Sequence, residues 1–434
     1  MQFLFKVIIL FLIVFNFRVP VFYNSAFVSI FLSAIYYIRK RGSIPFTYFF
    51  QRYNAVILIA TVILAFIIVL IEFLHSQEIM TAHEKRIWVM FMMLWATIFA
   101  LPLLVEGKES SAFEEIALVI CCAFALQGVI SLAAYLYQPL ADFLMNFKTP
   151  DIAEAEQEGS LDNRFRYLNL SGILLVELTA AFGVAFITFF WIQLKYNHPY
   201  MNGWKKYVFF VFIFLGTVFS GRTGFFGLIF GFCGWLLFSF TGIFLVIKRN
   251  IAYLIASASL LFFVFYFVFT GRQRQSFLDE VFPFAFEWYY NYRDYGKFQV
   301  SSMEATSLHY YYLTDETLLK GHGLTPYGGS SPYPHSDAGY TNNLVFGGIL
   351  FMVCLVIYQC LYSARPIAMA VKKNSRENLI DVAFFVMLFI YIFFVEIKAP
   401  AVGYMHLIEV MYLALGSGYV IQFYSQKEPD ELTE

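Results

Sequence analysis

The sequence predicts an all-α membrane protein that crosses the bilayer many times. Of its 434 residues, 60% are hydrophobic and only 14% are charged, and phenylalanine alone contributes 54. Mean hydropathy is +0.66. A soluble domain cannot hide so much apolar surface, whereas apolar stretches of about 20 residues are what a membrane-spanning helix requires.

Twelve apolar stretches are predicted to span the membrane. The first is expected to be a retained span and not a cleaved signal, because no small-residue cleavage site follows it. The first and the seventh are short for a hydrocarbon core that takes about 20 residues to cross. The twelve predicted spans are residues 3–17, 20–38, 53–74, 87–105, 116–136, 169–193, 207–220, 224–247, 251–270, 344–363, 379–396 and 407–424.

Basic residues predict the orientation of these spans, since short cytoplasmic loops are enriched in Lys and Arg. The basic clusters at 39–41, 195–206, 248–249 and 365–376 fall in alternate loops, so both termini are predicted to be cytoplasmic. The polar segment 271–343 then becomes one large extracytoplasmic loop. The predicted organisation is 1–136 N-terminal membrane helices, 137–168 an outer loop, 169–270 central membrane helices, 271–343 the large loop, 344–424 C-terminal membrane helices and 425–434 a cytoplasmic tail.

Charge and cysteine usage narrow the classes of partner and cofactor. A formal net charge of -1 gives no reason to expect nucleic acid as a partner. The loops contain no carboxylate cluster with metal-ligand spacing, so neither a metal nor another cofactor is predicted. All five cysteines fall inside predicted spans, which argues against a disulfide framework or a zinc site: Cys121, Cys122, Cys233, Cys354 and Cys360.

Three arginines on the predicted outer face are candidates for binding an anion. Arg164 and Arg166 stand at the entrance of the span 169–193, where two guanidinium groups could clamp a phosphate; alternatively they anchor the helix at the headgroups or pair with the acidic run 151–158. Arg222 lies in the tight turn 220–224, where a short outer loop usually carries no basic residue. A functional role and snorkelling to the headgroups are equally compatible with that position.

The large loop contains candidates for sugar binding and acid/base chemistry. The aromatic run 287–295 offers flat ring faces on which sugars stack, or forms an interfacial aromatic belt. Residues 303–319 are predicted to form a helix that Gly321-His322-Gly323 terminates. His335 is the best acid/base candidate, because its unperturbed pKa is near neutral and the following span would hold it at the membrane surface. The alternative is an ordinary polar loop residue.

Two acidic residues are placed within predicted spans. Glu177 lies inside the span 169–193, and Glu409 begins the last span beside His406. A charged side chain at membrane depth needs a partner, and either carboxylate could pair with an arginine of the bundle. Proton-coupled transport would use similar residues, so they do not distinguish an enzyme from a transporter.

Taken in order, the motifs resemble the O-antigen polymerase and ligase superfamily. These are multi-spanning glycosyltransferases that handle polyprenyl-diphosphate-linked oligosaccharides at the outer face of the bacterial inner membrane. The resemblance covers roughly residues 164–348. It rests on Arg-Phe-Arg-Tyr-Leu-Asn-Leu-Ser-Gly at 164–172, Ser-Gly-Arg-Thr-Gly at 220–224, and Gly-His-Gly at 321–323 before His-Ser-Asp-Ala-Gly-Tyr-Thr-Asn-Asn at 335–343.

The resemblance implies roles for particular residues. Arg222, with Arg166 or Arg164, is expected to face the diphosphate, and His335 to lie near the reacting hydroxyl. Ligases usually have Asn after this His, whereas here Ser336 and Asp337 follow, as in polymerases, and Asp337 becomes a second candidate for the base. The expected site comprises catalytic His335 and Asp337, diphosphate-binding Arg164, Arg166, Arg222 and Arg293, and sugar-binding Trp288, Tyr289 and Tyr340.

These residue types fit a metal-independent glycan transfer. Fixed positive charge stabilises a leaving diphosphate, and a base removes the proton of the attacking sugar hydroxyl. The expected partners are a polyprenyl-diphosphate-linked oligosaccharide and the lipid bilayer, and the resemblance implies a protein that regulates chain length. Two alternatives remain: a ligase that uses lipid A core as acceptor, and a twelve-span transporter or flippase for the lipid-linked sugar.

Overall fold

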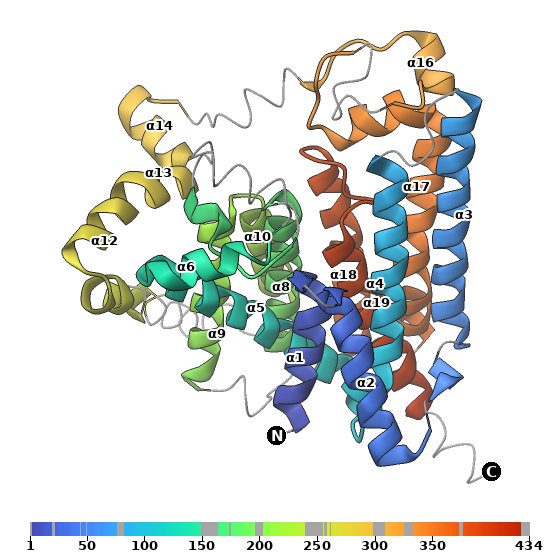
Figure 1. Ribbon diagram of the computed structural model, residues 1–434, viewed down its shortest axis with the longest axis horizontal. Coiled ribbons are helices and arrows are strands. Elements are labelled where there is room, and N and C mark those ends of the chain that lie inside the picture. The colour runs from blue at the N-terminus through green and yellow to red at the C-terminus, as the bar shows by residue number, and fades with distance from the viewer. Residues whose placement is uncertain are drawn as a thin grey trace.

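A computed structural model of the chain describes residues 2–19, 22–43, 45–48, 50–75, 82–148, 164–172, 175–195, 203–238, 255, 258–260, 262–297, 309–324, 333–372 and 376–426. These residues are almost entirely helical, with one two-stranded hairpin, so the predicted all-α class is confirmed (Figure 1). The tail 427–434, the acidic run 151–158 and, within the predicted span 251–270, residues 251–254, 256–257 and 261 lie outside the described residues.

The elements, with η marking short 3-10 or π helices, are α1 (Gln2–Phe15), β1 (Arg18–Val19), β2 (Tyr23–Asn24), α2 (Ser25–Arg41), η1 (Phe46–Tyr48), α3 (Arg52–Leu74), α4 (Ala82–Leu104), η2 (Glu109–Ser111), α5 (Ala112–Leu136), α6 (Gln138–Met145), η3 (Arg164–Tyr167), α8 (Leu175–Lys195), α9 (Lys205–Ser220), α10 (Gly224–Phe238), η5 (Val264–Val268), α12 (Gly271–Ser276), η6 (Phe277–Val281), α13 (Phe282–Ala285), α14 (Glu287–Tyr295), α16 (Asp315–Lys320), α17 (Gly339–Lys372), α18 (Arg376–Glu396) and α19 (His406–Ser425).

Seven helices among the described residues are long and apolar enough to cross a membrane. They are α3, α4, α5, α8, α17, α18 and α19. The chain is therefore membrane-embedded, as its composition predicts. Four more predicted spans correspond to α1, α2, α9 and α10, which have 14, 17, 16 and 15 residues and so fall short of the about 20 that cross a bilayer perpendicularly.

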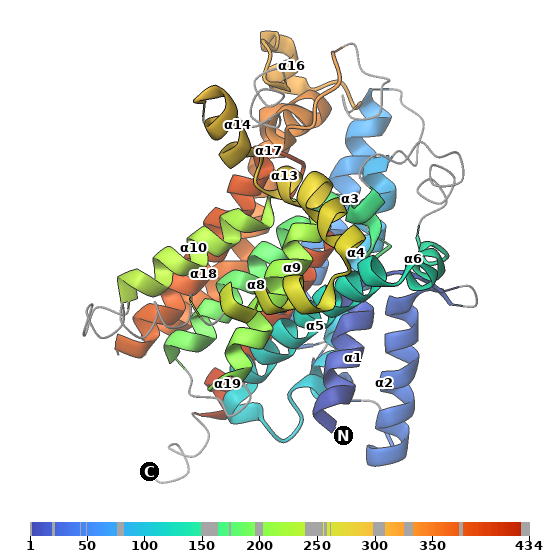
Figure 2. The same ribbon diagram turned by 90° about the vertical axis from the view of Figure 1, so that its left-hand side faces the viewer.

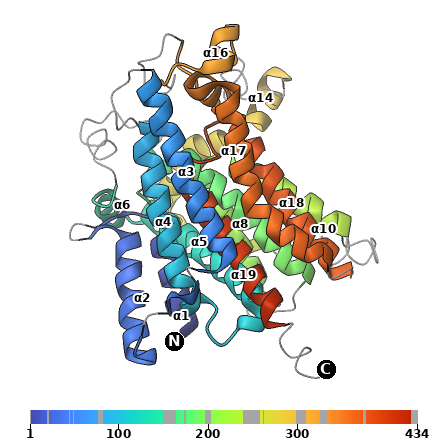
Figure 3. The ribbon, with the colours of Figure 1, turned by 90° about the vertical axis from the view of Figure 1, so that its right-hand side faces the viewer.

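Helix α19 forms the centre of the bundle. It packs against α4, α5, α8 and α17, and its residues from His406 to Phe423 are all buried. Helices α3, α4 and α17 lie on one side of it (Figure 3), and α8, α9 and α10 on the other (Figure 2). A helix buried on every side has no need of a polar face, and the few polar side chains of α19, such as Glu409 and Gln422, are buried as well.

Helices α8 and α10 pack closely enough that glycine is required between them. A Cβ atom on Gly227 would overlap the backbone of Gly183. Small residues at such a crossing let two membrane helices approach backbone to backbone. This contact fixes the start of α10, and with it the turn that carries Arg222.

The first part of α17 is ended by a sharp bend at Gly348, where φ is 67° and ψ is -166°. A side chain is strained at this positive φ, and a Cβ atom would also overlap the carbonyl of Leu319. The bend frees the carbonyls of Val345 and Phe346, which accept hydrogen bonds from the amides of His322 (2.7 Å) and Gly323 (2.8 Å). The Gly-His-Gly motif therefore caps a helix segment that is distant in sequence.

The helix predicted over residues 303–319 is wrong over 310–314. Within the described part of this stretch, the helix is α16, which begins after the N-cap Thr314 and ends at Gly321. The side chain of Thr314 accepts a hydrogen bond from the amide of Thr317, so the chain enters the helix only there. Helix α17 begins at Gly339, before the predicted boundary at 344, so residues 339–343 of the last motif are helical and residues 335–338 precede the helix.

Candidate functional site

Two of the predicted arginines meet around one aromatic ring. The guanidinium carbons of Arg166 and Arg222 each lie 4.8 Å from the centre of the Phe284 ring on α13. Arg166 Nε donates to the carbonyl of Ser220 at 3.3 Å, and Arg222 forms an ion pair with Glu287 on α14. Burial lowers the pKa of both arginines, and the neighbouring charge of Arg166 lowers the pKa of Arg222 further.

Lys398 adds a third positive charge that the sequence analysis missed. It follows α18, and its Nζ lies 5.9 Å from the centre of the Phe226 ring on α10. Burial lowers the pKa of Lys398 from its usual 10.5 to about 8, and the charge of Arg222 contributes to that shift. A signal was present in the sequence, because a lysine in the short predicted outer loop 397–406 is as unusual as the arginine at 222.

We call Arg166, Arg222 and Lys398 the cation cluster: all three are partly buried, and the charge of Arg222 is repelled by that of Arg166 and repels that of Lys398. Each depressed pKa reports that repulsion or the loss of hydration. An anionic ligand would relieve both, so the cluster is suited to a group that carries two or more negative charges.

Arg164 and Arg293 form ion pairs elsewhere. Arg164 pairs with Asp142 on α6 at 2.8 Å, and Arg293 pairs with its neighbour Asp294 at 2.7 Å. Exposed pairs of this kind contribute only about 0–1 kcal/mol. The structure therefore brings Arg166, but neither Arg164 nor Arg293, into contact with the ring that Arg222 also touches.

A buried lysine holds the segment that carries Arg166. The Nζ of Lys148 donates to the carbonyl of Asn169 (2.5 Å), to its side-chain oxygen (2.7 Å) and to the carbonyl of Ser171 (3.1 Å). The side-chain amide of Asn169 in turn donates to the backbone carbonyl of Arg166 at 2.9 Å. Burial lowers the pKa of Lys148 to about 7. The Asn and Ser of the motif at 164–172 thus serve to fix its arginine.

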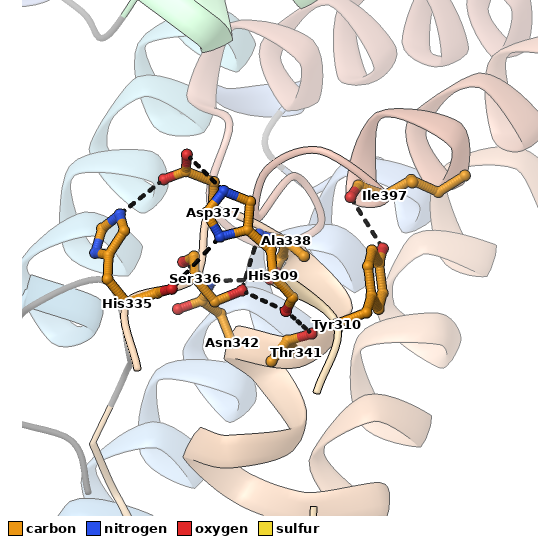
Figure 4. A network of polar contacts seen from close by, with 9 residues as sticks. All are labelled: His309, Tyr310, His335, Ser336, Asp337, Ala338, Thr341, Asn342 and Ile397. Atoms are coloured by element: carbon orange, nitrogen blue, oxygen red, sulfur yellow. Dashed lines mark hydrogen bonds and ion pairs between the residues drawn. The ribbon is translucent and has the colours of Figure 1, made fainter. Parts of the chain in front are cut away.

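Asp337 lies between two histidines. Its Oδ1 is 3.0 Å from Nε2 of His335, and its Oδ2 is 3.4 Å from Nε2 of His309 (Figure 4). The side chain of His309 is 16% exposed, whereas that of His335 is 56% exposed. The hydroxyls of Ser336 and Thr341 each donate to the carbonyl of His309 at 3.0 Å. His309 is therefore the better buried of the two imidazoles and its backbone is held in place, and the sequence offered no signal for it.

The His309–Asp337–His335 group, which we call the acid/base cluster, is linked by one hydrogen bond to the turn that carries Lys398. Tyr310 donates its hydroxyl to the carbonyl of Ile397 at 2.9 Å, and Ile397 directly precedes Lys398 (Figure 4). The anion-binding and acid/base groups predicted from separate motifs are thus joined through one contact.

The predicted sugar-binding residues divide into two sets. Trp288 and Tyr289 lie on α14 next to Glu287, about half of each side chain is exposed, and the centres of the two rings lie 6.1 Å apart. Tyr340 instead donates its hydroxyl to the carbonyl of Phe393 on α18 at 3.0 Å. Its polar tip is therefore engaged in a contact between helices.

The two intramembrane acids face backbone amides and a histidine among the described residues. Glu177 accepts a hydrogen bond from the amide of Leu407 at 2.8 Å and lies 3.4 Å from His406, and Glu409 accepts one from the amide of Gly403 at 3.4 Å. Glu177 thus binds an amide of the first turn of α19, and Glu409 binds an amide of the connection between α18 and α19. A pairing with an arginine is not found in the described residues.

Comparison with protein-family models, with curated proteins and with solved structures returned no match for this chain. The case for a function therefore rests on the geometry of the two clusters and on the motifs that supply them.

The depressed pKa of Lys398 predicts that anion binding weakens in mild alkali. As pH rises through about 8, the ammonium loses its proton while both arginines keep their charge. The affinity of the purified protein for farnesyl diphosphate is expected to fall about tenfold between pH 7 and 9, the effect of one partly buried charge. Lys398→Arg should remove this step. Equal slopes in the two proteins, measured by calorimetry, would contradict the assignment.

Proposed function

We propose that this chain is a glycosyltransferase of the bacterial inner membrane that polymerises lipid-linked oligosaccharide repeat units. The observation that carries the proposal is the cation cluster held next to the acid/base cluster by the contact between Tyr310 and Ile397. Leaving-group stabilisation and proton removal are the two functions that such a transfer needs, and each has its own group of residues here.

In the proposed reaction, the hydroxyl oxygen of the acceptor sugar attacks the anomeric carbon of the donor. The bond between that carbon and the diphosphate oxygen breaks, and the diphosphate leaves with the bonding electrons. Arg166, Arg222 and Lys398 neutralise the charge that develops on the leaving group. The proton of the hydroxyl passes to the acid/base cluster, in which Asp337 orients His309.

An apolar cavity beside the cation cluster supports a lipid-linked donor. The cavity has a volume of about 320 Å³ and is lined by aromatic and aliphatic residues of α9, η5, η6 and α13 and by residues that flank these elements, among them Phe277, Phe282 and Phe286. Phe282 belongs to the same short helix, α13, as the Phe284 ring that both arginines touch. The ring of Phe286, which also lines the cavity, lies 5.9 Å from that of Phe225, three residues after Arg222, so this region suits a ligand with an anionic head and an apolar tail, such as a polyprenyl diphosphate.

The membrane arrangement belongs to the same proposal. It places twelve spans across the inner membrane with both termini in the cytoplasm, and it puts both clusters on the periplasmic face. The growing chain and the single repeat unit are then both anchored in the bilayer beside the site, so donor and acceptor meet by diffusion in two dimensions. A regulator of chain length is the protein partner proposed.

The test is the length distribution of surface polysaccharide on a gel. A strain from which the protein is deleted is expected to carry single repeat units on its lipid core, and the wild-type protein should restore a ladder. Long chains that accumulate on the polyprenyl carrier would instead identify a ligase. Lipid-linked repeat units confined to the cytoplasmic leaflet would identify a flippase, and either result would overturn the polymerase assignment.

A further inference from the structure

We propose that Glu396 positions Lys398 of the cation cluster relative to the acid/base cluster, acting as one buried carboxylate that binds the segments carrying Lys398 and Asp337. The inference rests on the proposed function and concerns the same site. Glu396 is assigned no contact with substrate, so it is a positioning residue.

Glu396, at the end of α18, contacts two separate segments of the chain. Its side chain is buried, with the residue 1% exposed. Oε1 accepts a hydrogen bond from the Asn343 side-chain amide at 2.6 Å, and Oε2 accepts from the backbone amides of Ala401 (2.7 Å) and Val402 (2.9 Å). One carboxylate thus joins α17 to the chain after α18 through three hydrogen bonds.

The contact with Asn343 links Glu396 to the segment that carries Asp337. Asn343 lies in the first turns of α17, which begins two residues after Asp337. The helix start approaches Glu396 so closely that a Cβ atom on Gly339 would overlap the carboxylate and lie 2.7 Å from the carbonyl of Ala399. The neighbouring Asn342 donates to the carbonyls of Ser336 (2.7 Å) and Ala338 (2.8 Å), which fixes the turn around Asp337.

The contacts with Ala401 and Val402 link Glu396 to the turn that carries Lys398. The amide of Lys398 donates to the carbonyl of Val395 at 2.8 Å, so this residue continues directly from the end of α18. The backbone amides of Ala401 and Val402, which begin three residues after Lys398, donate hydrogen bonds to Glu396 and so close the turn. The position of the lysine is therefore set between α18 and the carboxylate, and the tyrosine contact to Ile397 supports the same turn.

This arrangement accounts for two residues of the motif at 335–343 that have no evident chemical role. Gly339 provides room for the carboxylate, and Asn343 supplies the donor for it. The sequence gave no sign of the link, because Glu396 ends an apolar helix more than fifty residues after the motif.

The test first replaces the amide partner of Glu396 with a carboxylate, and then exchanges the amide and the carboxylate between positions 343 and 396. Asn343→Asp places two carboxylates face to face and is expected to lower kcat at least tenfold, while KM for the lipid-linked donor changes less than threefold. Asn343→Asp combined with Glu396→Gln restores one donor and one acceptor and should recover kcat to within threefold of wild type. The substrate is the lipid-linked repeat unit isolated from a strain that lacks the protein, and the protein is purified in nanodiscs.

Controls separate this positioning role from a general loss of fold. Gln359→Leu replaces another buried amide side chain of α17 far from the turn, and its kcat should remain near that of wild type. Should Asn343→Asp fail to accumulate, Asn343→Ala takes its place with the same expected fall in kcat. Wild-type kcat in a folded variant at position 343, or a loss that the double variant does not recover, overturns the inference alone. Wild-type protein that extends no chains overturns the proposed function as well.

Discussion

Replacing Arg222 with alanine is expected to lower the rate of glycan transfer by about 100-fold or more, because a preorganised charge at a leaving group is worth roughly 3–4 kcal/mol in the transition state. Arg222 contacts the Phe284 ring, pairs with Glu287 and lies near enough to Lys398 to lower its pKa. Its removal therefore takes away the charge at the middle of the cation cluster. The measurement is the initial rate of chain extension by purified protein in nanodiscs.

Arg293→Ala is the matched control for this prediction. Arg293 lies on α14 and pairs with Asp294 on the surface, so its loss should change the rate by less than threefold. Arg222→Lys keeps the charge but loses the planar group that lies over the ring, and it is expected to retain an intermediate rate. If Arg222→Ala and Arg293→Ala lower the rate equally, the cation cluster is not the leaving-group site.

Replacing Asp337 with alanine is expected to lower kcat about 100-fold to 10,000-fold, the range that general base catalysis supplies. The carboxylate bridges His309 and His335, so its loss leaves both imidazoles without the group that orients them. His309→Ala should approach the effect of the aspartate variant, whereas His335→Ala should have a smaller effect, because that side chain is mostly exposed. Single-turnover rates at saturating donor measure all three.

The order of the two histidine variants distinguishes the sequence-based choice from the structural one. The sequence analysis selected His335 as the base, and the structure adds His309 on the better buried side of the same carboxylate. A larger defect in His335→Ala than in His309→Ala would return the role to His335. A donor affinity unchanged in all three variants is the control, because the proposal assigns diphosphate binding to the cations.

The class of the protein could be predicted from the sequence by itself. Hydropathy sums over neighbouring residues, so helices such as α3 and α5 are visible as apolar runs without any knowledge of their partners. Arg222 could be selected for a similar reason, since a tight basic turn between two apolar runs is a local pattern. The Arg and His motifs likewise indicated which segments contribute to the candidate site, although not which of their residues lie in contact.

The tertiary structure decided which residues share the site. Lys398, His309 and Glu396 act through contacts with segments distant in sequence, and Lys148 fixes the Arg166 segment in the same way. The bend at Gly348 also follows from a long-range contact, because the amides that cap the first part of α17 come from residues 322 and 323. Local patterns determine where the chain is apolar or turns, but pairing between distant segments depends on how the helices pack.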